Sequence, residues 1–148
     1  MSSTHNVASD TIKAMTLECS MLYVKDFARM REFYGNVLRA QPANTEWTDT
    51  WALFDVGGTG FALHAIPGEH AEKSELSSPP LMRDQSRVKL IFAVEDLSAE
   101  RARMEAMGIT MLQRSWQESA ESFDCTDPEG NIFQIAARTR LPHLFGRS

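Results

Sequence analysis

The chain repeats itself at a spacing of 70 residues, which limits the folds open to it. Three separate landmarks obey this spacing: Gly60 and Gly130, His64 and Gln134, and the segments 24–27 and 94–97. Agreement of three landmarks on one offset indicates an internal repeat, and the period is too long for a solenoid. Two modules of about 55–65 residues each make one domain of ordinary size.

The clearest local signal is the turn at residues 127–131, Asp-Pro-Glu-Gly-Asn. Asp at the first position, Pro at the second and Gly at the fourth predict a type I turn, capped by the Asp127 side chain. In the strand expected over 132–136, Phe133 and Ile135 share one face and Gln134 lies on the other. His64 is likewise one polar residue in an apolar strand, expected over 61–66.

Hydrophobic periodicity predicts the remaining elements of both modules. In the first module we expect strands over 14–24 and 47–56, a hairpin connection at 57–60, and a helix capped by Asp26. Six apolar residues of that helix have core spacing: Phe27, Met30, Phe33, Tyr34, Val37 and Leu38. In the second module we expect strands over 88–94, 109–116 and 119–126, and a helix over 99–107 that stops at Gly108.

Both modules are therefore predicted as β-α-β-β-β, at residues 14–66 and 87–137. Residues 67–86 are polar and aperiodic, which is typical of a linker or of a lid over a site. Residues 1–13 are expected to form a disordered tail, and residues 138–148 a peripheral one.

Composition narrows the partners and the compartment. The net charge is −5, which argues against a nucleic-acid surface. The sequence contains no apolar run that would span a membrane and no signal-peptide core at its N-terminus. Two cysteines without a secretory context predict free thiols in a reducing compartment, so a cytoplasmic protein is expected.

The sequence resembles the vicinal oxygen chelate superfamily, which includes glyoxalase I, extradiol dioxygenases, fosfomycin resistance proteins and bleomycin-binding proteins. Three segments carry the resemblance: Leu-Tyr-Val-Lys-Asp-Phe at 22–27, Phe-Tyr-Gly-Asn-Val-Leu at 33–38, and the turn at 127–131. The resemblance implies an α+β fold in which paired modules form curved mixed sheets around a cup. It also implies a homodimer, and it leaves the chemistry open, because function depends on the site.

Metal-dependent relatives place their ligands at positions that match Cys19, His64, Lys89 and Gln134. None of these four is a carboxylate, and the Lys89 ammonium would repel a metal ion. Cys19 and His64 are two zinc-binding residue types, which is too few for a site. His5, Glu69 or His70 would have to swing in to complete one. The resemblance therefore implies a cup without a catalytic metal, with a divalent metal at Cys19 and His64 as the alternative.

Each of these side chains has a structural and a functional interpretation. Cys19 is either a packed thiol or a thiolate whose pKa is lowered by Lys89 and His64. Lys89 either reaches solvent, anchors an anionic or carbonyl-bearing ligand, or forms a Schiff base. His64 and Gln134 are either satisfied polar residues or ligand-binding residues. Cys125 is expected to be buried and inert.

Three tryptophans complete the predicted ligand-binding set: Trp47, Trp51 and Trp116. They either pack in the core or a dimer contact, or form the aromatic wall of a small-molecule site. The leading hypothesis is a protein that binds a small organic molecule in the cup between modules, without turnover. The alternatives are a metal-dependent lyase or dioxygenase with a non-standard ligand set, and a structural partner protein with an empty cup.

Overall fold

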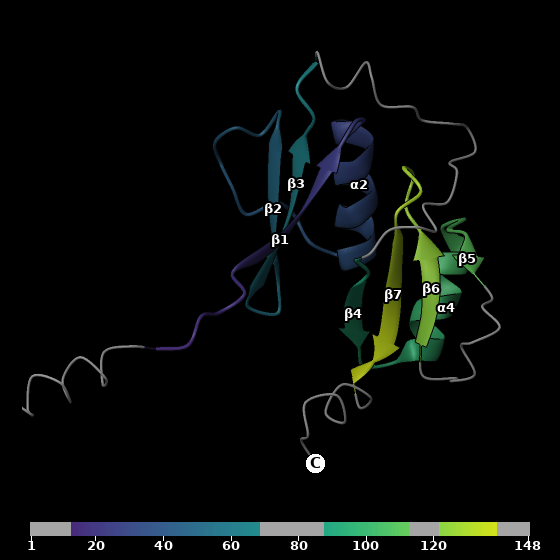
Figure 1. The fold of residues 1–148 in the computed structure, drawn as a ribbon. Helices are drawn as coiled ribbons and strands as arrows, with labels where there is room; N and C mark the ends of the chain where they lie inside the picture. The colour runs from purple at the N-terminus through teal and green to yellow at the C-terminus, as the bar shows by residue number, and fades with distance from the viewer. Residues whose placement is uncertain (1–12, 69–87, 113–121, 139–148) are drawn as a thin grey trace, which may run out of the picture.

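The computed structural model describes residues 13–68, 88–112 and 122–138, which form two sheets and two helices. One sheet, called sheet A, has the strand order β1-β3-β2, and the other, sheet B, has the order β4-β7-β6-β5 (Figure 1). The predicted tails, the linker or lid and Trp116 lie wholly or largely outside the described residues.

The first module consists of β1 (Cys19–Val24), α2 (Phe27–Leu38), β2 (Trp51–Val56) and β3 (Thr59–Ala65). Strand β3 lies between the other two, parallel to β1 and antiparallel to β2. A tight turn at Gly57–Gly58 joins β2 to β3, and both glycines have a positive φ. The chain passes from β1 to its parallel partner β3 through α2 and β2, because parallel strands need a long connection.

The second module repeats this arrangement with β4 (Leu90–Val94), α4 (Leu97–Ala106), β5 (Met111–Leu112), β6 (Ser122–Thr126) and β7 (Ile132–Ala137). Strand β7 is parallel to β4 and antiparallel to β6, and β5 is added at the far edge. The predicted α+β fold of two β-α-β-β-β-type modules is confirmed. The main deviations are strand ends, of which 14–24 is the largest, since β1 begins only at Cys19.

The first module has three strands within residues 13–68, which correspond to the three predicted strand ranges, although the β-α-β-β-β pattern has four. The segment that would form the fourth runs beside β2 and bonds to it largely through one side chain. The Ala43 amide donates to the Leu53 carbonyl at 2.7 Å, and the Asn44 side chain bonds to backbone atoms of Leu53 and Trp51. Pro42 has no N–H to donate, so a regular ladder cannot form there.

The prediction of a strand from residue 47 is also wrong. Trp47 has a φ of 56°, and its carbonyl accepts hydrogen bonds from the amides of Thr50 and Trp51. This is a turn, and β2 begins only after it. Local hydrogen bonding therefore overrides the β propensity of tryptophan.

The two modules share one hydrophobic core, with Tyr34 of α2 at its centre. The Tyr34 ring lies 4.9 Å from Phe61 of β3 and 5.8 Å from Phe133 of β7. Phe92 of β4 completes the cluster, 5.7 Å from Phe61. The helix-bearing faces of both sheets therefore meet in this core, and α2 packs against both modules.

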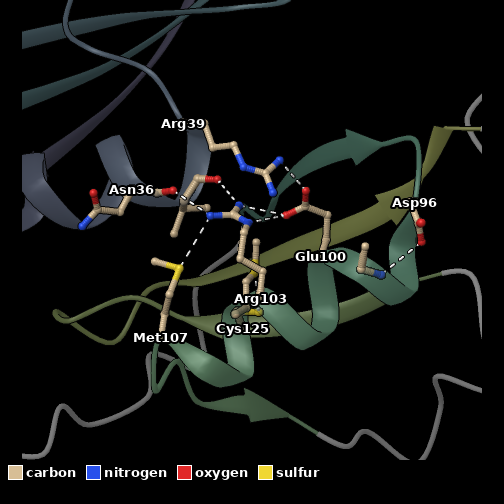
Figure 2. Close-up of polar contacts among 10 residues, drawn as sticks. Asn36, Arg39, Asp96, Glu100, Arg103, Met107 and Cys125 are labelled. Atoms are coloured by element: carbon tan, nitrogen blue, oxygen red, sulfur yellow. Dashed lines mark hydrogen bonds and ion pairs between the residues drawn. The ribbon is translucent and has the colours of Figure 1, made fainter.

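The second module also caps both ends of α2. At the N-terminal end, the Glu129 carboxylate accepts hydrogen bonds from the amides of Lys25 and Asp26, at 2.8–3.0 Å. At the C-terminal end, Arg103 of α4 donates to the carbonyls of Asn36 at 2.9 Å and Val37 at 2.7 Å (Figure 2). An anion at the N-terminus and a cation at the C-terminus both match the helix dipole.

Glu100 holds Arg103 in this position. Its carboxylate is largely buried and lies 2.8 Å from Arg103 and 2.7 Å from Arg39 (Figure 2). Arg39 follows α2 directly and has a left-handed backbone conformation. A residue just after α2 and a residue of α4 thus share one carboxylate across the module boundary.

Neither helix of the described chain has the length and apolar character needed to cross a membrane.

Candidate functional site

The predicted site residues of sheet A lie on the face that is turned away from the shared core. Strand pairing arranges this outer face in three rows: Tyr23, His64 and Trp51; then Met21, Ala62 and Leu53; then Cys19, Gly60 and Asp55. The alternating residues Phe61, Leu63, Ala52 and Phe54 are buried on the core side. Successive side chains of each strand therefore alternate between the core and the face that carries the candidate site.

His64 lies between two aromatic rings. Its ring centroid is 5.5 Å from that of Tyr23 and 5.9 Å from that of Trp51. The His64 Nδ1 atom is 2.8 Å from the Ala65 carbonyl oxygen. A carbonyl oxygen only accepts, so this geometry assigns a hydrogen to Nδ1 and leaves Nε2 as the basic nitrogen of the neutral ring.

A cavity of about 390 Å³ opens at the other end of the same face. Its wall includes Cys19, Trp51, Leu53 and Asp55. Gly60 keeps this wall close-packed, because a Cβ there would lie 3.1 Å from the Leu53 Cδ1 atom and 3.3 Å from the Cys19 Cβ atom. The volume falls in the range of small-molecule sites, and the wall is mainly apolar with a few polar groups, as such sites are.

Cys19 is not the activated thiol that one interpretation predicted. Burial raises the pKa of the Cys19 thiol, and the neighbouring Glu18 carboxylate raises it further. Its Sγ atom lies 3.3 Å from the Ser20 carbonyl oxygen, as a donor. Lys89 directly precedes β4 of the other sheet and pairs with Asp124, so it does not supply the positive charge that this interpretation required. At neutral pH Cys19 is a neutral thiol in the cavity wall.

On sheet B, Lys89 and Gln134 meet at a carboxylate that the sequence analysis did not single out. The Lys89 Nζ atom is 2.9 Å from Asp124 Oδ2, and the Gln134 Nε2 atom is 3.2 Å from Asp124 Oδ1. Asp124 is completely buried, whereas the Lys89 side chain is 36% exposed. The available signal was the pattern of β6, in which an acidic residue stands between apolar Phe123 and Cys125.

The structure brings the predicted residues together in two separate groups. His64 and Trp51 are adjacent on sheet A, and Lys89 and Gln134 share Asp124 on sheet B. Cys19 lies opposite Gly60, four residues before His64 on β3. At about 3.3 Å per residue, this spacing is too long for Cys19 and His64 to share a metal ion. The described residues contain no group of three His, Cys, Asp or Glu side chains that could hold a metal.

The described part of the chain contains two of the three tryptophans, and one of these two lines the cavity. Trp51 lines the cavity, Trp47 is 75% exposed in its turn, and Trp116 lies outside the described residues. The modules of one chain meet through their helix-bearing faces, so the outer faces of sheets A and B point away from this interface.

A larger cavity, of about 610 Å³, lies between α2 and the second module. It is lined by Arg29, Glu32 and Asn36 along the solvent-facing side of α2, and by residues 107–110 after α4. None of the predicted site residues that the structure describes lines it. We therefore place the candidate site on the outer faces of the sheets.

Residues 19–136 match the family model of the Glyoxalase-like domain, which covers both modules. The chain belongs to the glyoxalase-like family. The expected superfamily is thus confirmed.

Solved structures share this glyoxalase-like fold. FosX, a fosfomycin resistance protein from Listeria monocytogenes, is 16% identical with a TM-score of 0.63, over 84% of this chain and 92% of that chain. The FosX complex with Mn(II) and sulfate is 14% identical with a TM-score of 0.61, over 91% and 99% of the two chains. An integron cassette protein from the mobile metagenome of V. Cholerae is 21% identical with a TM-score of 0.60, over 86% and 98%.

At these identities the structural likeness concerns the fold alone. A search of curated protein sequences gives no match for this chain. The chemistry of the glyoxalase-like site must therefore be argued from its own residues.

Proposed function

We propose that this glyoxalase-like protein binds a small organic molecule on the outer face of sheet A, without a catalytic metal. The observation that carries the proposal is the continuity of the His64 row with the 390 Å³ cavity, since Trp51 belongs to both. Trp51 and Tyr23 offer flat apolar surface, and His64 offers a nitrogen with a lone pair. Aromatic walls with one or two polar groups are typical of drug-sized ligand sites.

The test is a ligand screen followed by titration, with tryptophan fluorescence as the signal. The substitution Trp51→Phe should remove most of the ligand-dependent change in fluorescence and weaken binding. The matched control is Trp47→Phe, because Trp47 is a neighbouring tryptophan that does not line the cavity. Equal ligand-dependent changes in Trp51→Phe and the unmodified protein would contradict the proposed site.

The alternative is a metal-dependent lyase or dioxygenase, and FosX has been crystallised with Mn(II). The donor set of this chain does not fit such a metal. A glyoxalase-type site needs neutral imidazoles and carboxylates around the ion. Here the matching positions on sheet B carry an ammonium and an amide N–H, and both are directed at the one carboxylate, Asp124.

Metal analysis separates the two functions. Protein purified without an affinity tag and without a chelator should contain far less than one transition metal per chain, before and after incubation with manganese, zinc, iron or nickel. Stoichiometric metal that is lost in His64→Ala would support the enzyme alternative instead.

We further propose that a second copy of this chain is the partner that completes the site. Strands β1 and β4 are edge strands of their sheets within the described chain, and an unpaired edge is a template for pairing. Both carry exposed apolar residues on their outer faces: Met21 is 39% exposed, Tyr23 is 62% exposed and Ile91 is 42% exposed. A homodimer would bring the outer face of sheet A in one copy to the outer face of sheet B in the other.

Light scattering on a gel-filtration column measures the expected dimer mass directly. Ile91→Asp should shift the protein to the monomer, because a charge would be buried at the interface. Met107→Asp is the control, since Met107 is similarly exposed but lies after α4. A monomeric unmodified protein at micromolar concentration would refute the dimer.

A further inference from the structure

The Lys89–Asp124–Gln134 group combines a buried anion with a partly exposed cation. Asp124 has no exposed surface, and its two oxygens receive Lys89 Nζ at 2.9 Å and Gln134 Nε2 at 3.2 Å. Within the described residues, the Lys89 ammonium makes this one bond and retains two further N–H donors. Its side chain is 36% exposed, so a molecule on the outer face of sheet B can reach it.

The position of the Lys89 ammonium in the fold indicates its function. Lys89 and Gln134 occupy the two positions of the second module where the family resemblance implies metal ligands. The Lys89 ammonium has only N–H groups, which cannot coordinate a metal ion, and Gln134 directs its amide N–H at Asp124. A positive charge nevertheless remains at this place, because the ammonium is fixed to a carboxylate from β6.

We propose that the Lys89 ammonium takes the electrostatic role of the metal and binds an anionic oxygen of the ligand. Suitable oxygens belong to a carboxylate, a phosphonate or an enolate. Asp124 is a positioning residue, because it would touch Lys89 and not the ligand. This inference rests on the proposed function and extends it, since it states the charge that the ligand carries.

The carboxylate beneath Lys89 does not cancel this attraction. A bound anionic oxygen would lie about 2.8 Å from Nζ, as charge-assisted hydrogen bonds do. On the solvent side of the ammonium, the same oxygen would be roughly twice as far from Asp124. Coulomb energy falls with distance, so the repulsion would be about half the attraction.

Benzoate and benzamide are suitable probes, because they have nearly the same shape and differ in charge. Ligand-observed NMR at millimolar concentration would measure the binding of each probe to the full-length protein. We expect benzoate to bind at least about tenfold more tightly than benzamide, the effect of one charge-assisted bond. Lys89→Met keeps most of the side-chain length, removes the charge, and should abolish this preference.

Two further variants separate ligand binding from a purely structural role. Asp124→Asn leaves the cation and removes the repulsion, so benzoate should bind as well as before or a few-fold more tightly. The double variant Lys89→Met/Asp124→Asn removes the buried charge together with its cation and should fold stably, yet it should lack the benzoate preference. A structural ion pair would lower stability in the single variants and leave the probe preference unchanged.

Three results would overturn the inference: equal binding of both probes to the unmodified protein, unchanged benzoate binding in Lys89→Met, or no binding of either probe. Equal binding of both probes that depends on Trp51 would leave the proposed function intact and remove only the claim about charge. The opposite result would be a ligand screen in which nothing binds at Trp51 while benzoate still binds at Lys89. That result would contradict the proposed site on sheet A and leave the claim about charge intact.

Discussion

Tyr34 donates its phenolic hydrogen to a carboxylate that water barely reaches. The Tyr34 oxygen is 2.6 Å from Asp127 Oδ2, and Asp127 is 1% exposed. Burial, with help from the Asp127 charge, raises the pKa of Tyr34 far above its usual range, so the phenol remains a donor. The bond joins the central helix of the first module to the turn before β7.

Removing this donor should destabilise the fold. In Tyr34→Phe, the Asp127 Oδ2 atom retains the Asn131 side chain and loses its shortest hydrogen bond. We expect a loss of about 1–3 kcal/mol in the free energy of unfolding, the usual effect of weakening the bonding of a buried charge. Urea denaturation measures it. Tyr23→Phe is the control, because Tyr23 is exposed and should change stability by less than about 0.5 kcal/mol.

The pH dependence of that loss has a defined sign. Burial raises the pKa of Asp127 above 3.8, while the bonds from Tyr34 and Asn131 lower it. Ionised Asp127 therefore lowers the folding stability as the pH rises through the folded-state pKa, and this penalty is absent below pH 3.8. Without the Tyr34 donor the folded-state pKa rises further. The effect of Tyr34→Phe should accordingly be larger at pH 7 than at pH 4, and equal effects would contradict this assignment.

The two thiols should differ in reactivity. Burial and the Asp124 charge raise the pKa of Cys125 to about 12, and Cys125 is completely buried. Cys19 is half-buried with a raised pKa, so it should react with a disulfide reagent at pH 8 more slowly than free cysteine. We expect one slow equivalent in the native protein, two in urea, and none in native Cys19→Ser. A rapid native reaction would show an activated thiol.

Sequence reasoning at this scale succeeded where a residue acts on its own neighbourhood. The prediction that Asp127 caps its turn is confirmed, because its Oδ1 atom accepts from the amides of Glu129 and Asn131. Asp124 was missed because Lys89 and Gln134, which bond to it, are distant in sequence, and an acidic residue between two apolar ones of β6 was the single local signal. The raised pKa of Cys19 comes from burial and from the Glu18 charge, and the burial of a single thiol does not follow from the sequence.

At the scale of elements, α2 depends on side chains from the other module. Arg103 binds two of its terminal carbonyls and the Glu100 carboxylate. Arg103→Met should cost about 1–3 kcal/mol in unfolding free energy, because the partly buried Glu100 loses a partner and α2 loses a cap. Arg39→Met removes the other partner of Glu100 from a side chain that is 61% exposed, and solvent-exposed ion pairs contribute less than about 1 kcal/mol. Chemical denaturation of both variants should rank them in this order, and the reverse order would show that the capping bonds contribute nothing.

Element types were predictable from periodicity, and element pairing was not. The 70-residue repeat holds for both helix caps, since Asp26 and Asp96 each accept a hydrogen bond from the amide three residues later. It fails in the register of the last strands. His64 pairs with Tyr23, whereas Gln134 pairs with Ile91, which is the counterpart of Met21. The hairpin turns differ as well, since residues 127–131 join β6 to β7 and Gly57–Gly58 join β2 to β3.

At the scale of the whole molecule, the shared core predicts one cooperative unfolding transition. Phe61, Phe92 and Phe133 come from both modules and contact each other around Tyr34, so neither module has a core of its own. Amide hydrogen exchange should give similar opening free energies for β3 and β7. A difference of several kcal/mol between the opening free energies of β3 and β7 would show that the modules unfold independently.

The fold class was accessible from the sequence because repeat, helix periodicity and turn chemistry all agreed. The packing of the two modules against each other could not be predicted from the sequence. It depends on side chains such as Glu129 and Arg103, whose targets are backbone atoms about 67 to 104 residues away. For the same reason the sequence could not place His64 and Gln134 in separate groups of one chain.

The caps that cross between modules lie on α2 and come from the second module, and this gives the tandem an inherent order. The turn of the second module supplies Asp127 and Glu129, whereas the corresponding turn of the first module is Gly57–Gly58 and has no side chains to offer. Two fused copies of the first module would leave the ends of both helices without these partners. After the duplication that the repeat implies, the two halves have become complementary, so neither can stand in for the other.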